Sequence, residues 1–337
     1  MHTLQRRTPS IASLHRILLN IIYEPQHGSL KESGVIRLTT VGILGHPKRP
    51  NTKPVGDHIE RTLNAHGIAT WHREVWEPSD VRDQIATSDM VVAIGGDGAM
   101  LRAARLCGEF GVPVLGINMG RLGFLTEVAD PDAWDSSLEP LIAGDFWIEQ
   151  RMMLDARVER AGEVLHRGTA LNDVVVSGLS SGSIVQMDLY IDAHWATTYS
   201  SDALIISTPT GSTAYALAVG GPILPPDLKN ILILPAAAHL SMDRPIVLSE
   251  GSLVAVRLSE ENRNDSIITI DGTRLADMVQ NDILYINAAD HESRFIRLRD
   301  PNYFYRSLLD RLEPRVNRSL PQEKILRSDK RKTEDDA

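Results

Sequence analysis

The strongest constraint on the fold is a stretch in which an apolar strand runs through a glycine turn into a helix. Met90–Ile94 is a continuous apolar run, as expected of a buried parallel strand. Gly95–Gly98 places three glycines around Asp97, and Ala99–Leu106 combines good helix formers with apolar residues. A strand, a tight turn and a helix N-terminus direct backbone N–H groups toward a phosphate. In open α/β sheets, ligands bind at this edge.

Asp97 is unusual in such a turn, because a carboxylate repels a phosphate. The conflict disappears if Asp97 holds a metal ion or takes a proton from a nucleophile. The alternative is that Asp97 only caps the helix that follows it. This stretch alone leaves both interpretations open.

The residues around this turn predict a parallel, doubly wound sheet, because strands and helices alternate from Val35 to Ile117. The expected strands and helices, in chain order, are Val35–Leu44, Pro54–His66, Ala69–Val75, Ser79–Thr87 (capped by Ser79), Met90–Ile94, Ala99–Leu106 and Pro113–Ile117. A further helix is expected over Asp132–Leu141, ended by Gly144-Asp145. The fold class is therefore an α/β, Rossmann-like parallel-sheet domain at the N-terminal side.

From about residue 148 the pattern changes to short apolar segments separated by turns, which predicts a largely antiparallel β domain. The expected strands are Met152–Glu159, Leu165–Ala170, Asp173–Ser177, Val185–Ile191, Trp195–Ser200, Ala203–Ser207, Leu253–Leu258, Ile267–Ile270 and Ile283–Ala288. One helix is expected near Ser212–Val219. A strand at Phe295–Leu298 and a helix at Tyr303–Leu312 follow, and we expect the helix to return to the first domain.

These patterns predict four regions. Residues 1–34 are expected to form a poorly ordered extension, and residues 314–337 a disordered polar tail. Residues 35–147, joined by 299–313, form the α/β nucleotide-binding domain, and residues 148–298 form the β-rich domain.

Composition excludes several classes of function. The 337 residues carry 35 basic and 44 acidic side chains, a formal charge of −9, so nothing overall favours nucleic-acid binding. No run approaches the roughly 20 apolar residues of a membrane span, and a cytoplasmic protein is expected. Cys107 is the only cysteine, which excludes an internal disulfide. No lysine stands between Lys53 and Lys229, so a P-loop enzyme is not expected.

Three further motifs have the chemistry of a binding site. Asn172-Asp173 precedes a strand and suits the vicinal hydroxyls of a sugar, although a turn cap is the plainer interpretation. Ser207–Thr213 places five hydroxyls and a glycine after a buried strand, which favours an anionic or hydroxyl-rich ligand, and Tyr215 suits stacking on a base. Phe124 lies in a glycine-rich loop with Arg121, either as a face for a planar ring or tucked into the core. Asp271-Gly272 is typical of a plain hairpin turn.

Taken together, the motifs resemble those of bacterial-type NAD kinases, the ATP-NAD kinase family. The motifs are Gly95-Gly96-Asp97-Gly98, Leu122-Gly123-Phe124, Asn172-Asp173 and Thr208-Pro209-Thr210-Gly211-Ser212-Thr213-Ala214-Tyr215, and the likeness extends over roughly residues 35–312. The glycine turn is shared with diacylglycerol-kinase-like lipid kinases and phosphofructokinases, whereas the threonine-rich run is far more specific. A lipid or sugar kinase and a non-enzymatic NAD(H) sensor of the same fold are the alternatives.

The resemblance implies phosphorylation of the 2′-hydroxyl of the adenosine ribose of NAD⁺ by ATP, giving NADP⁺ and ADP. It implies Asp97 as the proton acceptor, and a divalent cation, Mg²⁺, that accompanies ATP. It implies a homo-oligomer (a dimer or tetramer). We expect no protein metal ligand set, no nucleic-acid partner and no membrane partner. The binding residues that it implies are Gly98, Arg102, Phe124, Asn172, Asp173, Asp202, Thr213, Ala214, Tyr215, Ala216, Leu217 and Ala218.

Overall fold

The computed structural model describes residues 37–46, 48–120, 123–180, 182–301, 303–305 and 308. The expected extension 1–34, the expected tail 314–337 and Arg121 lie outside these residues. No helix in the described part of the chain is long and apolar enough to cross a membrane.

The N-terminal half folds around one six-stranded sheet, sheet A, in the order β2-β1-β3-β4-β18-β5. All neighbouring strands are parallel except β18 and β5. The strands are β1 (Thr40–Leu44), β2 (Ala69–Arg73), β3 (Met90–Gly95), β4 (Val114–Asn118), β5 (Trp147–Arg151) and β18 (Ser293–Arg297). The predicted α/β fold and its alternating element order are confirmed.

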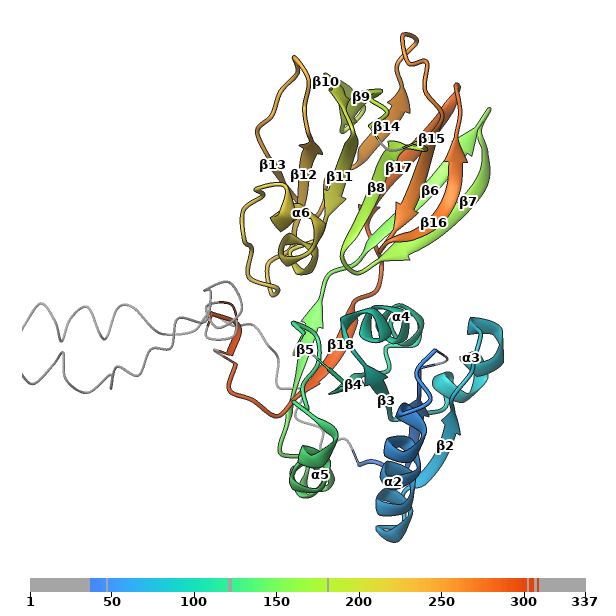
Figure 1. Cartoon of the computed structure of the whole chain (residues 1–337), viewed down its shortest axis with the longest axis vertical. Coiled ribbons are helices and arrows are strands. Elements are labelled where there is room, and N and C mark those ends of the chain that lie inside the picture. The colour runs from blue at the N-terminus through green and yellow to red at the C-terminus, as the bar shows by residue number, and fades with distance from the viewer. Residues whose placement is uncertain are drawn as a thin grey trace, which may run out of the picture. The chain divides into compact units, whose positions relative to one another are not determined.

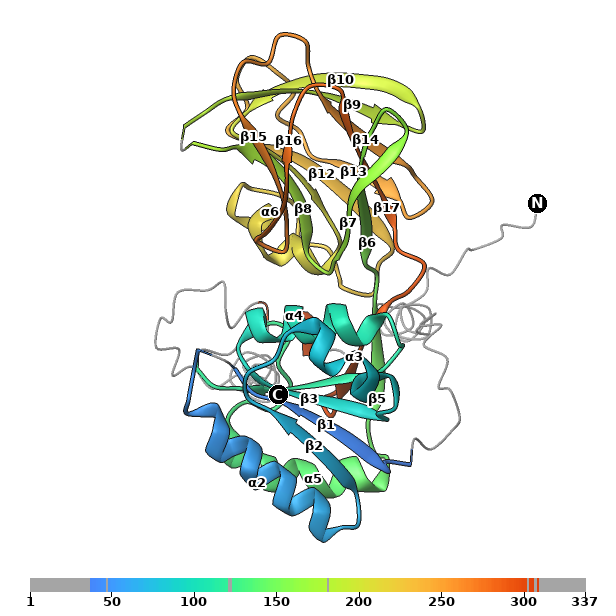
Figure 2. The ribbon, with the colours of Figure 1, turned by 90° about the vertical axis from the view of Figure 1, so that its right-hand side faces the viewer.

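Helices cover both faces of sheet A, as Figure 2 shows. Helices α2 and α5 pack on one face through residues such as Ile59 and Trp134. Helices α3 and α4 pack on the other through residues such as Val81 and Met100. Their bounds are α2 (Thr52–Ala65), α3 (Pro78–Ala86), α4 (Asp97–Gly108) and α5 (Trp134–Ala143), with the short 3₁₀ turn η1 (Pro131–Ala133) before α5.

The ends of these elements differ from the prediction in places. Ser79 does not cap α3: the N-cap is Glu77, which forms a reciprocal capping box with Asp80. The first strand is shorter than expected, because only Thr40–Leu44 is paired. Helix α5 does end at Gly144, whose left-handed φ of 73° suits a glycine cap.

The second half is a sandwich of two six-stranded antiparallel sheets, which face each other in Figure 1. Sheet B has the order β10-β9-β14-β17-β6-β7, and sheet C the order β13-β12-β11-β8-β15-β16. Sheet B contains β6 (Leu154–Arg160), β7 (Glu163–Ala170), β9 (Val185–Ile191), β10 (His194–Ser201), β14 (Val254–Leu258) and β17 (Asp282–Ala288). Sheet C contains β8 (Asp173–Gly178), β11 (Ala203–Ser207), β12 (Asn230–Ala236), β13 (Ile246–Ser249), β15 (Ser266–Ile270) and β16 (Thr273–Met278).

The apolar core of the sandwich lies between the two sheets. Val158, Leu189 and Leu284 contribute from sheet B, while Val176 and Ile206 contribute from sheet C. Every second residue of these strands points inward, as alternating strands require. The predicted antiparallel β region is confirmed, and the strands β5, β12, β13 and β16 are additions to the prediction.

The expected helix at Ser212–Val219 is two short pieces: the 3₁₀ turn η2 (Thr210–Thr213) and α6 (Tyr215–Ala218), separated at Ala214. Ala214 has ψ −121°, outside helical geometry. Of the expected final helix, Tyr303–Tyr305 and Leu308 are helical, and its other residues lie outside the described part.

Candidate active site

Asp97 is the first residue of α4, immediately beyond the carboxyl end of β3. Its two carboxylate oxygens accept the backbone N–H groups of Phe124 at 2.8 Å and of Leu125 at 3.0 Å. The N-cap of α4 is Gly96, and no side chain caps it. The capping interpretation of Asp97 is therefore wrong, since its carboxylate is held by the loop after β4.

Gly123 allows this loop to approach so closely. A Cβ added at Gly123 would lie 1.9 Å from Oδ1 of Asp97, so a larger residue there must push the carboxylate aside. A carboxylate offers about four lone-pair sites, and only two of those on Asp97 accept the loop N–H groups. Asp97 thus keeps capacity to accept a proton or contact a cation.

The basic residues near this turn come from the loop after β1. His46 lies against Gly95, since a Cβ on that glycine would be 3.7 Å from His46 Cδ2. Burial lowers the pKa of His46, and the nearby positive charges of Arg49, Lys48 and Arg102 lower it further. The turn thus has cations beside it.

Arg102 is tied to neighbouring protein groups. Its guanidinium donates to the backbone oxygen of Trp76 at 2.6 Å and stacks 3.9 Å from the centroid of the indole ring. It also pairs with Glu77 at 3.3 Å. Gly98 is exposed beside Asp97, with nothing within 4 Å of a Cβ built on it.

A second group of predicted site residues meets at the ends of β8 and β11. Asp173 pairs with Ser207 across these strands, and Thr208 follows directly. Thr208 donates from its N–H to the Asn172 oxygen at 2.9 Å. Gly211 packs on the same carbonyl so tightly that a Cβ would lie 2.2 Å from it. The structure therefore brings the asparagine–aspartate pair and the threonine-rich run together.

Most hydroxyls of that run serve the protein itself. Ser207 and Thr208 donate to backbone oxygens of Asn172 and Leu171, and Ser212 links Pro209 to Leu224. Tyr215, by contrast, is 42% exposed and presents a ring for stacking. Asn172 is partly exposed. The Thr213 hydroxyl also donates to a backbone oxygen, that of Thr210, at 3.1 Å. Among the described residues, ligand contacts are thus more available to Asn172 and the start of α6 than to these hydroxyls.

Asp173 is buried, and its environment opposes its charge. Burial, together with the nearby carboxylate of Asp271, raises the pKa of Asp173 to about 7. The sequence predicts a hairpin turn at Asp271-Gly272, and β15 and β16 do pair on either side of it through Ile270 and Thr273. The only signal that marked it was an Asp-Gly pair at a strand end.

Asp202 lies apart from these residues in the chain. It stands before β11, whereas Asp173 faces Ser207 at the other end of that strand. The five residues of β11 span about 16 Å. Within one chain, Asp202 therefore does not join Asn172 and Asp173.

A buried ionic network, which no local sequence motif marks, contacts both groups. Glu149 accepts from Arg297 at 2.7 Å and from Arg151 at 2.9 Å. Arg297 also donates to the Leu125 oxygen at 2.9 Å, while Arg151 reaches the Thr210 hydroxyl at 3.5 Å. Burial alone would raise the pKa of Glu149, but the two guanidinium groups outweigh it and lower that pKa to about 2.

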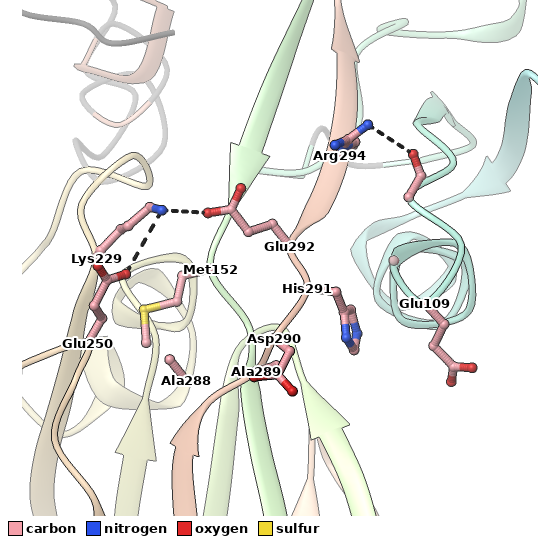
Figure 3. Close-up of a pocket in the computed structure, with 12 residues that line it drawn as sticks. Glu109, Met152, Lys229, Glu250, Ala288, Ala289, Asp290, His291, Glu292 and Arg294 are labelled. Carbon is pink, nitrogen blue, oxygen red and sulfur yellow. Dashed lines mark hydrogen bonds and ion pairs between the residues drawn. The ribbon is translucent and has the colours of Figure 1, made fainter. Parts of the chain in front are cut away.

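A hollow of about 480 Å³ lies at the other end of α4, lined by residues such as Glu109 and Lys229 (Figure 3). Lys229 is paired there with Glu292 at 2.9 Å. Helix α4 has 12 residues, so about 16 Å of helix separates this hollow from Asp97. The hollow is therefore not part of the candidate active site.

Comparison with known proteins matches both halves of the chain to one family. The "ATP-NAD kinase N-terminal domain" matches residues 41–146, and the "ATP-NAD kinase C-terminal domain" matches residues 171–298. An NAD kinase of Geobacter sp. (strain M21) is 36% identical over 84% of this chain and 93% of its own length. One from Chloroflexus aurantiacus is 35% identical over 82% of this chain and 99% of its own length.

Solved structures agree on the fold. Yeast NADH kinase complexed with NADH aligns with a TM-score of 0.71 at 22% identity, over 82% of this chain and 87% of that chain. An NAD kinase from Archaeoglobus fulgidus in complex with ATP aligns with a TM-score of 0.63 at 21% identity, over 80% of this chain and 97% of that chain. Together with the sequence relatives, these similarities show that the chain belongs to the ATP-NAD kinase family.

Proposed function

We propose that this chain transfers the γ-phosphoryl group of ATP to the 2′-hydroxyl of the adenosine ribose of NAD⁺, with Asp97 as proton acceptor. The observation that carries the proposal is the Asp97 carboxylate, fixed by two loop N–H groups at the carboxyl edge of sheet A. A carboxylate held in one orientation suits general-base work. The bond from the ribose oxygen to phosphorus forms, the bond from phosphorus to the ADP oxygen breaks, and the ribose proton goes to Asp97.

The remaining roles follow the same arrangement. We assign Asn172, Asp173 and the segment Thr213–Ala218 to NAD⁺. The pairing of Asp173 with Ser207 and the hydrogen bond from Thr208 to the Asn172 oxygen support this, because they bring the threonine-rich run beside the asparagine–aspartate pair. Phe124 flanks Asp97 through its own backbone N–H. Gly98 leaves room for a substrate to approach Asp97 closely. Arg102 adds positive charge near the turn while its guanidinium stays stacked on the Trp76 ring.

A divalent cation, Mg²⁺, is part of the proposal. Mg²⁺ prefers oxygen ligands and usually enters with substrate phosphates. The free lone pairs of the Asp97 carboxylate fit such an ion, and the ion would neutralise charge on the triphosphate when bound. Lys48 and Arg49, which both act on the pKa of His46, add positive charge on the same edge.

We further propose a cytoplasmic homo-oligomer, a dimer or tetramer. Asp202 bears on this assembly, because the length of β11 separates it from Asn172 and Asp173 within one chain. A second copy of the chain would bring another Asp202 to the site if the assembly places it beside that pair. Light scattering of the purified protein tests this, and a monomer at assay concentration would contradict it.

The activity is tested by incubating purified protein with NAD⁺, ATP and Mg²⁺ and measuring NADP⁺. NADP⁺ formation that needs both ATP and the metal supports the proposal. Stabilisation by NAD⁺ without turnover would instead indicate a sensor. Phosphorylation of lipid or sugar, but not NAD⁺, would indicate a related kinase.

A further inference from the structure

The carboxylate of Asp271 is hydrogen-bonded to the backbone of the segment that carries Asn172 and Asp173. It accepts three successive backbone N–H groups: those of Leu171 at 3.0 Å, Asn172 at 2.8 Å and Asp173 at 3.2 Å. Asp271 follows β15, which pairs with β8, and its own N–H donates to the Asp173 oxygen at 3.0 Å. Its side chain thus replaces the ladder of hydrogen bonds where β8 begins.

The carbonyl side of the same segment is also fixed. The Leu171 oxygen accepts the Thr208 hydroxyl at 2.5 Å, and the Asn172 oxygen accepts the Thr208 N–H at 2.9 Å. The side-chain amide of Asn172 forms no hydrogen bond with any other residue that the structure describes. The backbone is therefore held on both sides, while this side chain keeps its capacity for a ligand.

Asp271 also connects this segment to the helix of Asp97. Arg105 of α4 places a guanidinium nitrogen 3.8 Å from Asp271 Oδ2, and the Asp271 side chain is only 2% exposed. Leu171 packs in the same apolar cluster as Met100 and Ala104 of α4. The two groups of the candidate site therefore share contacts with one helix.

We propose that Asp271 is a positioning residue that presents Asn172 and Asp173 to NAD⁺. This inference rests on the proposed function, because it assumes that the pair binds the dinucleotide. Asp271 has no role in phosphoryl transfer itself. Its loss should weaken NAD⁺ binding and leave ATP binding nearly unchanged.

The test is Asp271→Asn, which keeps the shape of the side chain and tolerates its left-handed φ of 47°. The variant places an NH₂ group where a carboxylate oxygen accepts an N–H. We expect the KM and the calorimetric Kd for NAD⁺ to rise about tenfold or more, with the KM for ATP within about twofold. NAD⁺ affinity within about twofold of wild type would overturn the proposal.

The matched control is Asp192→Asn. Asp192 also has a left-handed φ, 49°, and accepts a backbone N–H from Leu253 at 2.9 Å, but it belongs to the β9–β10 turn of sheet B. We expect this variant to bind NAD⁺ as wild type does. An equal loss in both variants would overturn a specific role for Asp271.

A double-mutant cycle separates positioning from general stability. If Asp271 acts through Asn172, then Asp271→Asn should cost less than about threefold in affinity when Asn172→Ala is already present. Losses that multiply in full would overturn the proposal. If Asp271→Asn does not fold, Arg105→Gln is the variant that tests the proposal. A rise of about two- to fivefold in the Kd for NAD⁺ supports the positioning role of Asp271, and an unchanged Kd overturns it.

Measuring NAD⁺ binding by calorimetry also tests the positioning role of Asp271 separately from the proposed kinase activity. Wild-type protein that binds NAD⁺ but makes no NADP⁺ contradicts the proposed function. The effect of Asp271→Asn on the Kd still tests the positioning role, because calorimetry needs no turnover.

Discussion

The guanidinium of Arg297 and the carboxylate of Glu149 meet at 2.7 Å with both side chains almost fully buried. Arg297 lies on β18 and Glu149 on the adjacent antiparallel strand β5. Arg297 also holds the Leu125 carbonyl, whose residue donates its N–H to Asp97. A buried ion pair in sheet A is therefore linked through Leu125 to Asp97, the candidate proton acceptor.

Glu149→Gln should destabilise the protein by roughly 3–5 kcal/mol, because it leaves the buried guanidinium of Arg151 without its counter-ion and leaves Arg297 with only Glu127, 3.3 Å away. Urea unfolding at pH 7 measures the loss. Glu159→Gln is the control, since Glu159 forms a partly exposed pair with Arg157 and should cost less than about 1 kcal/mol. Equal losses of stability in Glu149→Gln and Glu159→Gln would contradict the claim that burial makes the Glu149 pair important.

The same residue predicts a pH dependence at the acid end. The pKa of Glu149 is lower in the folded state, about 2, than its ordinary 4.5. Its contribution is therefore present above about pH 4.5 and lost as pH falls through about 2. Wild-type stability should fall more steeply than that of Glu149→Gln across this window, and parallel curves would contradict it.

Asp173 predicts the opposite dependence near neutrality. Its folded-state pKa is raised from 3.8 to about 7, so the folded state binds more protons than the unfolded state between these values. Stability should fall as pH rises from about 4 to 7, by on the order of 2–4 kcal/mol. Melting temperatures of wild type and Asp173→Asn at pH 5.5 and 8 test this. The variant should lose less than wild type, and an equal loss would contradict the raised pKa.

Gly123→Ala should lower kcat by about tenfold or more, since its Cβ would meet the Asp97 carboxylate and misplaced catalytic groups lose rate steeply. Gly251→Ala is the control, because nothing lies within 4 Å of a Cβ there. Both variants should fold, as judged by circular dichroism. Unchanged turnover in Gly123→Ala would show that the contact with Asp97 is not needed.

The fold of the first half was predictable because its strands are short apolar runs that alternate with helical patterns. The end of the chain was harder: Phe295–Leu298 was expected as a strand, but its place in sheet A beside β4 depends on contacts far apart in sequence. Strand β12 contains Pro235, which weakens a strand pattern. It is accommodated because β13 pairs only with Asn230–Ile233, so within the described part of the chain no strand pairs with Pro235 on that side of β12.

The site was predictable where a motif is local and hidden where it is not. Asp97 and the Thr208–Tyr215 run stand out within a few residues of sequence. Asp271 and Glu149 act on partners about 100 to 150 residues away, so no local pattern marks them. Asp202 shows the converse, because its motif is local and yet β11 separates it from Asp173.

The central claim is that Asp97 accepts the proton of the ribose 2′-hydroxyl. Asp97→Asn keeps the side-chain shape but removes the base. NADP⁺ formation measured at saturating NAD⁺, ATP and Mg²⁺ should fall by about 10²- to 10⁴-fold, with the calorimetric Kd for NAD⁺ within about threefold of wild type. Turnover equal to that of wild type would contradict the claim.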